Sequence, residues 1–243
     1  MACEHHYVHS NHEGYLLCGF CRTYRSLLAV PPEDLYTEDY WTHAEGHSTL
    51  KEQAYNVDEF IINGSSKAQY VLDRIEVENR GAALEIGCAP GRLLLLLKGI
   101  GGFRNVIGIE ANRAYEKDIR EIGCFGGDLL FGIFPDVTPQ GWGGRFDYIT
   151  AIDVFEHSWD PEAFLEECAR LLKPGGQLFL MLPLASKELE ERFFEAKEHV
   201  FIHSRPNLLV MLTEAGFSGF KAGNWTNGHD SISARRVTDD ADL

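Results

Sequence analysis

Long apolar runs and basic residues are both scarce in this sequence. No stretch approaches the ~20 apolar residues that a helix needs to cross a bilayer. The first residues, Met-Ala-Cys-Glu-His-His, have neither the basic region nor the apolar core of a signal peptide. Lys and Arg number 22 against 37 Asp and Glu, a formal net charge of −15. Because such an excess of acid repels a nucleic-acid backbone, the composition predicts a cytoplasmic protein that binds neither a membrane nor nucleic acid.

The chain is large and apolar enough for a full core. Its 243 residues are 44% hydrophobic, which suits one large α/β domain with an appendage. In a cytoplasmic setting the six cysteines are better interpreted as thiols or metal ligands than as disulfides.

A cysteine and histidine cluster opens the chain. Cys3-Glu4-His5-His6 is followed by Cys18-Gly19-Phe20-Cys21, and Cys-x-x-His with Cys-x-x-Cys supplies the four ligands of a closed tetrahedral zinc site. The pattern predicts Cys3, His6, Cys18 and Cys21 as ligands of a structural Zn²⁺, although His5, His9 or His12 could replace His6. The alternative is a histidine-rich leader with incidental thiols.

The segment up to residue 57 is predicted to be separate from the main domain at 58–243. Pro31-Pro32 ends the zinc unit, and an aromatic cluster at 35–41 follows. The cluster either forms a lid over a ligand or packs on the core. Apolar residues at helical spacing between Asp58 and Ile75 predict one or two helices before the first strand.

The stretch from Ala82 to Leu97 predicts a ligand-binding loop. An apolar strand ends at Ile86, the chain turns at Gly87, and Leu93–Leu97 predicts a buried helix. Arg92 replaces the third glycine of a dinucleotide fingerprint, and the Gly-Lys-Ser/Thr of a phosphate loop is absent. An acid before the first glycine, Glu85, suits a ligand that carries an ammonium group.

This loop resembles motif I of the class I S-adenosylmethionine-dependent methyltransferases, with Ala89 in place of the second glycine. The resemblance implies that the cofactor contacts the loop at Glu85, Gly87, Cys88, Ala89, Gly91 and Arg92.

Further cofactor contacts are expected at the ends of the next strands. Val106–Glu110 predicts a second strand whose terminal acid, Glu110, accepts both ribose hydroxyls. Asn112 is a helix cap or a further ribose contact. The family resemblance implies that the adenine lies against Gly127, Asp128 and Leu129, although a plain Gly-Asp turn explains those residues equally well.

A second motif follows the strand at 146–153. Asp-x-x-Glu-His-x-x-Asp-Pro begins at Asp153, and Leu-Lys-Pro-Gly-Gly at Leu172 ends the helix predicted over Glu162–Leu172. Both resemble the ubiquinone-biosynthesis-like branch of the class I methyltransferases over about residues 70–220. The resemblance implies that Asp153 and Val154 lie between methyl donor and acceptor. The next pair in the motif, Glu156 and His157, could hold a divalent metal.

The last third is expected to build the acceptor site, over about residues 183–230. Helices are predicted at 187–196 and 207–215, and strands at 177–182, 217–221 and 231–237. The alternating pattern predicts a doubly wound, Rossmann-like α/β sheet, and the resemblance implies seven strands with the last antiparallel. A base is needed if the acceptor is a hydroxyl: His199 is the first candidate, with His157 and His203 as alternatives. Each could also be a packed histidine.

Together these patterns predict an enzyme that moves the methyl group of S-adenosylmethionine to a small-molecule acceptor by direct displacement. A sugar or natural-product intermediate and O-methylation are the leading choices, and the identity of the acceptor and the oligomeric state stay open. Two other classes compete: a catalytically inactive, zinc-bearing interaction protein on the same fold, and a hydride-transfer enzyme, which the missing third glycine disfavours.

Overall fold

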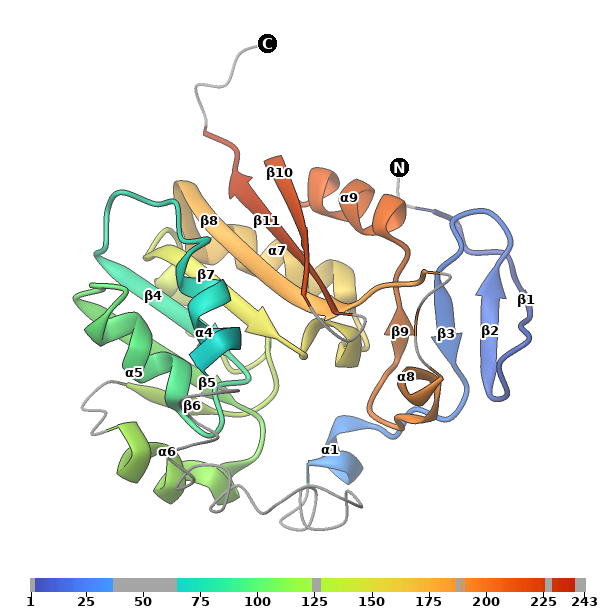
Figure 1. Ribbon diagram of the computed structural model, residues 1–243, viewed down its shortest axis with the longest axis horizontal. Helices are drawn as coiled ribbons and strands as arrows, with labels where there is room; N and C mark the ends of the chain where they lie inside the picture. The colour runs from blue at the N-terminus through green and yellow to red at the C-terminus, as the bar shows by residue number, and fades with distance from the viewer. Residues whose placement is uncertain are drawn as a thin grey trace.

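The computed structural model in Figure 1 describes residues 3–36, 65–123, 128–186, 189, 191–225 and 229–238. Some expectations lie outside these residues: the aromatic segment beyond residue 36, the first helical residues predicted after Asp58, part of the helix predicted at 187–196, and Gly127. The predicted boundary at residue 57 also lies there, so the division into two parts stays a prediction.

A seven-stranded sheet forms the centre of the fold. Its strand order is β10-β11-β8-β7-β4-β5-β6. Neighbouring strands from β8 to β6 run parallel, whereas β11 is antiparallel to both β8 and β10. The expected α/β sheet with an antiparallel last strand is thereby confirmed. The strands are β4 (Ala82–Ile86), β5 (Asn105–Glu110), β6 (Leu129–Phe131), β7 (Phe146–Ile152), β8 (Leu172–Pro183), β10 (Phe217–Asn224) and β11 (His229–Arg236).

Helices cover both faces of this sheet. One face carries α4 (Ser65–Leu72), α5 (Arg92–Gly99) and α6 (Glu116–Gly123), and the other carries α7 (Pro161–Leu171) and α9 (Arg205–Glu214). Because strands between two helical layers are buried on both sides, their sequences are continuous apolar runs rather than alternating ones. All five residues of β4 are buried.

Within the described residues, short connecting elements include α1 (Pro32–Leu35), α8 (Arg192–Glu195) and the 3₁₀ turns η2 (Arg113–Tyr115), η3 (Gln140–Trp142) and η4 (Phe155–His157).

Two apolar cores result, one on each face. Leu94 and Leu97 of α5 pack with Tyr148 and Phe179 on the first face. On the second face, side chains of α7 and α9 pack with Leu84 and other strand residues. The sheet is therefore a rigid platform, and the loops at its edges are the parts that are free to vary.

Local sequence signals explain where the second-face helices begin. The Asp160 side chain accepts a hydrogen bond from the Ala163 N–H (2.9 Å), and Pro161 occupies the first helical turn. Ser204 caps α9 in the same way by accepting from the Asn207 N–H (3.3 Å). Both starts follow the usual rule of a short polar cap with a proline in the first turn.

A second, four-stranded sheet has the order β1-β2-β3-β9. Its first three strands come from the start of the chain and the fourth from the region predicted to build the acceptor site; in Figure 1 the small sheet lies at the right, beside α8. None of the helices within the described residues is both long enough and apolar enough to span a bilayer. The strands of this small sheet are β1 (Tyr7–His9), β2 (Tyr15–Cys18), β3 (Tyr24–Ser26) and β9 (Phe201–Ile202).

Candidate functional site

One cavity of about 1180 Å³ opens along the carboxyl edge of the parallel strands. The residues that directly follow β4, β5, β6 and β7 all line it: Gly87, Ala111, Gly132 and Asp153. This is the edge at which open α/β sheets bind their ligands. The cavity therefore lies where the glycine loop and the strand ends were expected to meet.

The loop after β4 has the backbone that its glycines allow. Gly87 has φ +73° and Gly91, which precedes α5, has φ +96°. A Cβ on Gly87 would lie 2.3 Å from Cγ2 of Val154. Glycine is thus required at position 87 both for its conformation and for the close approach of the loop after β7. Gly87, Cys88, Ala89, Arg92 and Val154 line the cavity as expected, whereas Gly91 lies behind it.

Glu85 places an unsatisfied carboxylate beside this loop. Its Oε2 atom has no hydrogen-bond partner within the described part of the chain, although the residue is buried. Burial, with the neighbouring Glu110 carboxylate, raises the pKa of Glu85 well above its usual range. An orphaned buried acid on a cavity wall fits a ligand that brings an ammonium group.

Glu110 ends β5 with both carboxylate oxygens engaged. Oε2 accepts a hydrogen bond from the Ala89 N–H (3.1 Å) and Oε1 accepts one from the Asn112 N–H (3.0 Å). These bonds hold the side chain rigidly beside the loop, with lone pairs left for hydroxyl donors. Asn112 caps the next turn by accepting from the Ala114 N–H (2.9 Å), and it does not line the cavity.

The expected adenine contact at Asp128 and Leu129 is wrong. Strand β6 begins at Leu129 rather than ending there, so both residues lie at the opposite end of the strand from the cavity. The Asp128 side chain is 75% exposed and faces Arg145 at 3.9 Å. Residues 132–136, which follow β6, line the cavity in their place.

Asp153 lies at the turn after β7 in a conformation uncommon for residues other than glycine, with φ +53°. Its carboxylate pairs with Nζ of Lys67 at 2.5 Å and with Nε2 of His229 at 3.0 Å. Both partners line the cavity and neither was expected from the sequence. Only the fold brings these residues together, since they are far apart in sequence.

Two of the three candidate histidines face the cavity together. The rings of His157 and His199 are 5.4 Å apart, and both line the cavity. Nδ1 of His199 lies 2.7 Å from the carbonyl oxygen of Phe193. Because a carbonyl can only accept, Nδ1 carries the proton and Nε2 is left as the acceptor. Nδ1 of His157 lies 3.3 Å from the hydroxyl of Tyr36.

Glu156 completes this group of cavity side chains. It is buried, and neither carboxylate oxygen has a partner within the described residues. Glu156, His157 and His199 each present one ligand atom within 4.8 Å of the others. A divalent metal among these groups therefore stays an alternative to a free base.

His203 does not belong to this group. It is buried away from the cavity between the rings of Phe155 and Phe201, at centroid distances of 5.1 and 5.4 Å. Burial lowers its pKa to about 3. His203 is a packed core histidine, and the expectation of a catalytic role for it is wrong.

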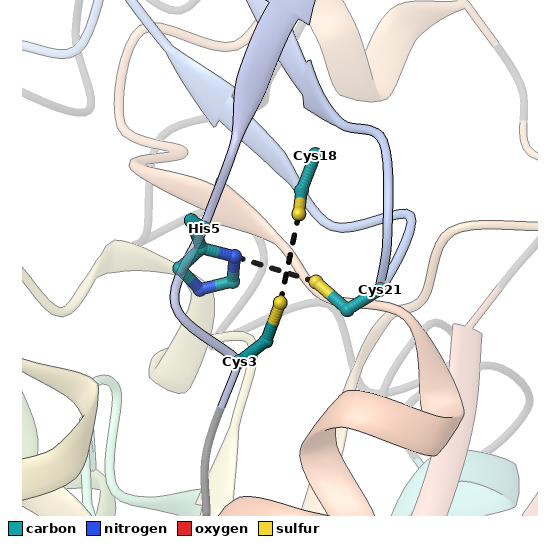
Figure 2. Close-up of side chains that lie close together, drawn as sticks. All are labelled: Cys3, His5, Cys18 and Cys21. Carbon is teal, nitrogen blue, oxygen red and sulfur yellow. Dashed lines mark hydrogen bonds between the residues drawn. The ribbon is translucent and has the colours of Figure 1, made fainter.

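A second group of candidate ligands lies in the small sheet, where Cys3, His5, Cys18 and Cys21 converge (Figure 2). Sγ of Cys3 is 3.7 Å from Sγ of Cys18, and Sγ of Cys21 is 3.3 Å from Nδ1 of His5. Tetrahedral Zn²⁺ at its usual bond lengths separates two sulfurs by about 3.8 Å and a sulfur from a nitrogen by about 3.6 Å. The four atoms therefore fit zinc.

The fourth residue in the cluster is His5 and not the expected His6. Burial alternates along the segment: Cys3, His5 and Tyr7 are half-buried, whereas His6 is exposed and packs edge-on against Phe20. Alternate residues of an extended chain share one face, so His5 shares the face of Cys3 and His6 does not. The correction stays within the alternatives that the sequence left open.

Comparisons with known proteins agree with this fold. A family model described as a methyltransferase domain matches residues 65–221, more than half of the chain. A ubiquinone biosynthesis O-methyltransferase of Xanthomonas oryzae pv. oryzae is 57% identical over 117 residues, which are 47% of this chain and 47% of that protein. The chain thus spans about half the length, or less, of the curated relatives it matches.

Solved structures show the same fold at low identity. A chain of the Haloferax volcanii complex that contains the Trm112 methyltransferase activator has a TM-score of 0.65 at 16% identity, over 79% of this chain and 99% of its own. An O-methyltransferase family protein from Burkholderia thailandensis has a TM-score of 0.61 at 12% identity, over 84% and 64%.

The family match covers the glycine loop, the strand-end acids and the motif after β7, which are the features that line the cavity. The chain belongs to this methyltransferase-domain family, and its sheet and cavity have the arrangement of the class I S-adenosylmethionine-dependent methyltransferases.

Proposed function

We propose that this enzyme methylates a hydroxyl group of a small-molecule acceptor and that His199 takes the hydroxyl proton. One observation supports this most directly: a single cavity joins the glycine loop and its acids to the His157 and His199 pair. Its volume, about 1180 Å³, exceeds the roughly 300–1,000 Å³ of a pocket for one ligand. There is room for a cofactor and an acceptor side by side.

Glu85 and Glu110 are the residues that would hold the cofactor. The orphaned Oε2 of Glu85 suits the ammonium group, and the fixed carboxylate of Glu110 suits the two ribose hydroxyls. When bound, S-adenosylmethionine supplies a sulfonium methyl that is already activated for displacement. The protein's contribution is therefore alignment of the acceptor and exclusion of water.

His199 is prepared to receive a proton at Nε2. The Phe193 carbonyl fixes its tautomer, and burial lowers the pKa of His199 below its ordinary value. The ring is therefore neutral near pH 7, as a general base must be. A hydroxyl placed at Nε2 loses its proton as the methyl group is transferred to its oxygen.

The choice of O-methylation is also supported by the Xanthomonas relative, whose name is that of an O-methyltransferase. The match spans less than half of that protein, so its acceptor does not transfer to this chain. A sugar or natural-product intermediate is our proposed acceptor class. A catalytically inactive interaction protein is the second candidate, and the presence of Glu85 and Glu110 on the wall of a large cavity argues against it.

Calorimetry tests the cofactor. The protein should bind S-adenosylmethionine with micromolar affinity and should not bind a nicotinamide cofactor. Glu110→Ala should abolish the binding because both ribose contacts are lost, and Asn112→Ala, which changes a neighbour outside the cavity, should retain it. Equal binding by wild type and Glu110→Ala would contradict the proposed site.

A panel of hydroxylated acceptors tests the transfer. Sugars, phenols and hydroxy acids are offered with S-adenosylmethionine, and release of S-adenosylhomocysteine is the readout. Methylation of oxygen in at least one class supports the proposal. Methylation of nitrogen or carbon alone would overturn the hydroxyl chemistry but not the cofactor assignment.

We also propose a second bound group, a structural Zn²⁺ at Cys3, His5, Cys18 and Cys21. The donor set and its spacings support it. Four protein ligands leave no open position for water or substrate, so this metal takes no part in the methyl transfer itself.

A further inference from the structure

The small sheet is completed by the segment that carries His199. Strand β9 pairs antiparallel with β3, so that Tyr24 lies opposite Ile202 and Arg25 opposite Phe201. His199 precedes β9 by only two residues. Residues 3–36, called the N-terminal unit below, therefore contact the segment that forms the proposed acceptor side of the cavity.

Backbone contacts tie the two segments together on both sides of this pairing. The Ser26 N–H donates to the Val200 carbonyl (2.9 Å), and the Val30 N–H donates to the Lys197 carbonyl (3.0 Å). These bonds bracket His199 in sequence. A shift of the N-terminal unit would move the backbone that positions the His199 ring.

The metal-ligand turn itself makes the next contacts. The Ser204 hydroxyl donates to the carbonyl of Cys21, and the Ser204 N–H donates to Oγ1 of Thr23 (3.2 Å). Cys21 is one of the four candidate ligands. One hydrogen bond thus links residue 204 directly to the Cys18–Cys21 turn, and a second links it to Thr23 just beyond that turn.

Side chains connect the unit to the cavity at two further points. His12 stacks on Phe194 with ring centroids 3.7 Å apart, and Phe194 adjoins the Phe193 carbonyl that holds His199. Tyr36, which follows the small sheet in the chain, lines the cavity and contacts His157. The N-terminal segment is therefore part of the acceptor wall.

The apolar cluster that holds the unit in this position is small: Tyr15 of the unit packs with Phe193, Phe194 and Ile202. The strands of the small sheet are only two to four residues long. Four large apolar side chains of the unit are exposed: Val8, Phe20, Leu27 and Leu28. Short strands with a small core need a staple to be stable.

We propose that Zn²⁺ bound by Cys3, His5, Cys18 and Cys21 positions residues 197–204, and with them His199 and the acceptor side of the cavity, while leaving the cofactor side unaffected. This inference rests on the proposed function in one respect, the role of His199. The two sides of the cavity then depend on different elements. The Zn²⁺ site orders the acceptor side, and the glycine loop after β4 holds the methyl donor on the other side.

A pair of adjacent histidine variants tests the ligand set. Zinc content is measured in His5→Asn and His6→Asn protein, and the cobalt-substituted proteins are examined by visible absorption. His5→Asn should lower zinc content and lose the absorption of tetrahedral, thiolate-bound Co²⁺, whereas His6→Asn should keep both. A wild-type protein without zinc, or loss of the metal from His6→Asn alone, would overturn the site.

Hydrogen–deuterium exchange then tests the positioning role. In His5→Asn, or after chelation of the wild-type metal, peptides spanning 197–204 should exchange at least about tenfold faster, and peptides spanning 82–110 should be unchanged. S-adenosylhomocysteine binding by calorimetry should also be unchanged. Unaltered exchange at 197–204, or equal loss of protection in both regions, would overturn the positioning role.

The metal also needs a kinetic readout. With an acceptor identified in the panel above, loss of zinc should lower kcat or raise KM for the acceptor and leave KM for S-adenosylmethionine unchanged. Failure of wild-type protein to bind S-adenosylmethionine would instead contradict the proposed function and leave the zinc results standing.

Discussion

The three candidate histidines differ in chemistry because their surroundings differ. His199 has a fixed tautomer that leaves Nε2 as an acceptor, His157 contacts a tyrosine hydroxyl, and His203 packs against two aromatic rings. Burial lowers the pKa of all three. Position relative to the cavity is therefore the ground on which we propose His199 as the base.

The pH dependence of the reaction tests this assignment. A base must be neutral to accept a proton, so kcat/KM should be level above neutral pH and fall on the acid side. This fall is the acid limb of the pH profile. Because burial lowers the pKa of His199, the apparent pKa of the acid limb should lie below 6.5.

His199→Gln should lower kcat by about 10²- to 10⁴-fold and remove the acid limb without changing S-adenosylmethionine affinity. His203→Gln, a change outside the cavity, serves as the comparison and should keep the limb. A limb that persists in His199→Gln would assign the base elsewhere.

For the cavity and for the candidate zinc site, the sequence predicted the kinds of residue involved better than it predicted the individual residues. Cys3, Cys18 and Cys21 converge as expected. The fourth candidate ligand is His5 instead of the neighbouring His6, because side-chain direction alternates along an extended segment. Glu85 and Glu110 line the cavity. Their place could be predicted because each lies at the end of a clear apolar strand. Lys67 and His229 could not be foreseen, since only the folded chain brings them to Asp153.

Among the elements, the turn from β4 to α5 strictly requires glycine at its first position. Gly87 has φ +73° and no room for a Cβ, because Val154 would lie 2.3 Å away. Gly102, after the same helix, has φ +71° but open space around it. The two positions share a backbone conformation and differ only in crowding.

Alanine at each position separates these two effects. Gly102→Ala should lower the free energy of unfolding by about 1–2 kcal/mol through its backbone conformation. Gly87→Ala should cost about 1–3 kcal/mol more through overpacking, since valine is stiff, and should also weaken S-adenosylmethionine binding. Urea denaturation and calorimetry measure both. Equal losses of stability in the two variants would mean that the loop yields to the added methyl group.

Element boundaries were least predictable where strands are short or irregular. Strand β6 has three half-buried residues at the sheet edge, too few for a clear pattern, and this led to the error at Asp128. Strand β8 begins at Leu172, five residues before the expected start. Its pairing with β7 jumps from Phe146–Leu172 to Tyr148–Gln177, so the Lys-Pro-Gly-Gly segment bulges from the ladder.

On the scale of the whole molecule, the net negative charge should favour association with S-adenosylmethionine over association with S-adenosylhomocysteine. The protein carries a formal net charge of −15, and S-adenosylmethionine is a cation at neutral pH. Long-range attraction should therefore accelerate its association. S-adenosylhomocysteine lacks the sulfonium charge and serves as a matched neutral ligand.

Stopped-flow fluorescence tests this effect, because Trp159 lines the cavity and can report binding. The Debye length falls from about 30 Å at 0.01 M salt to about 8 Å at 0.15 M. Over that range the association rate constant of S-adenosylmethionine should fall severalfold, and that of S-adenosylhomocysteine should change little. Equal salt dependence for both ligands would exclude steering by net charge.

The overall architecture followed from the sequence, whereas the way the N-terminal unit joins it did not. Strand–helix alternation and apolar runs predict a doubly wound sheet. A two-residue strand, Phe201–Ile202, carries no periodic signal, and its partner at Tyr24 is far away in sequence. The joining of the two sheets is therefore a property of the folded chain that local patterns do not encode.

The distance between β3 and β9 along the chain also has a consequence during synthesis. The three strands β1–β3 leave the ribosome before β9, and the outer edge of β3 has no partner strand until Ile202 has emerged. An open strand edge on a nascent polypeptide invites pairing with other chains. Early capture of a metal by thiols within the first 21 residues would fold these strands while translation continues, and would shorten the time in which that edge is a hazard.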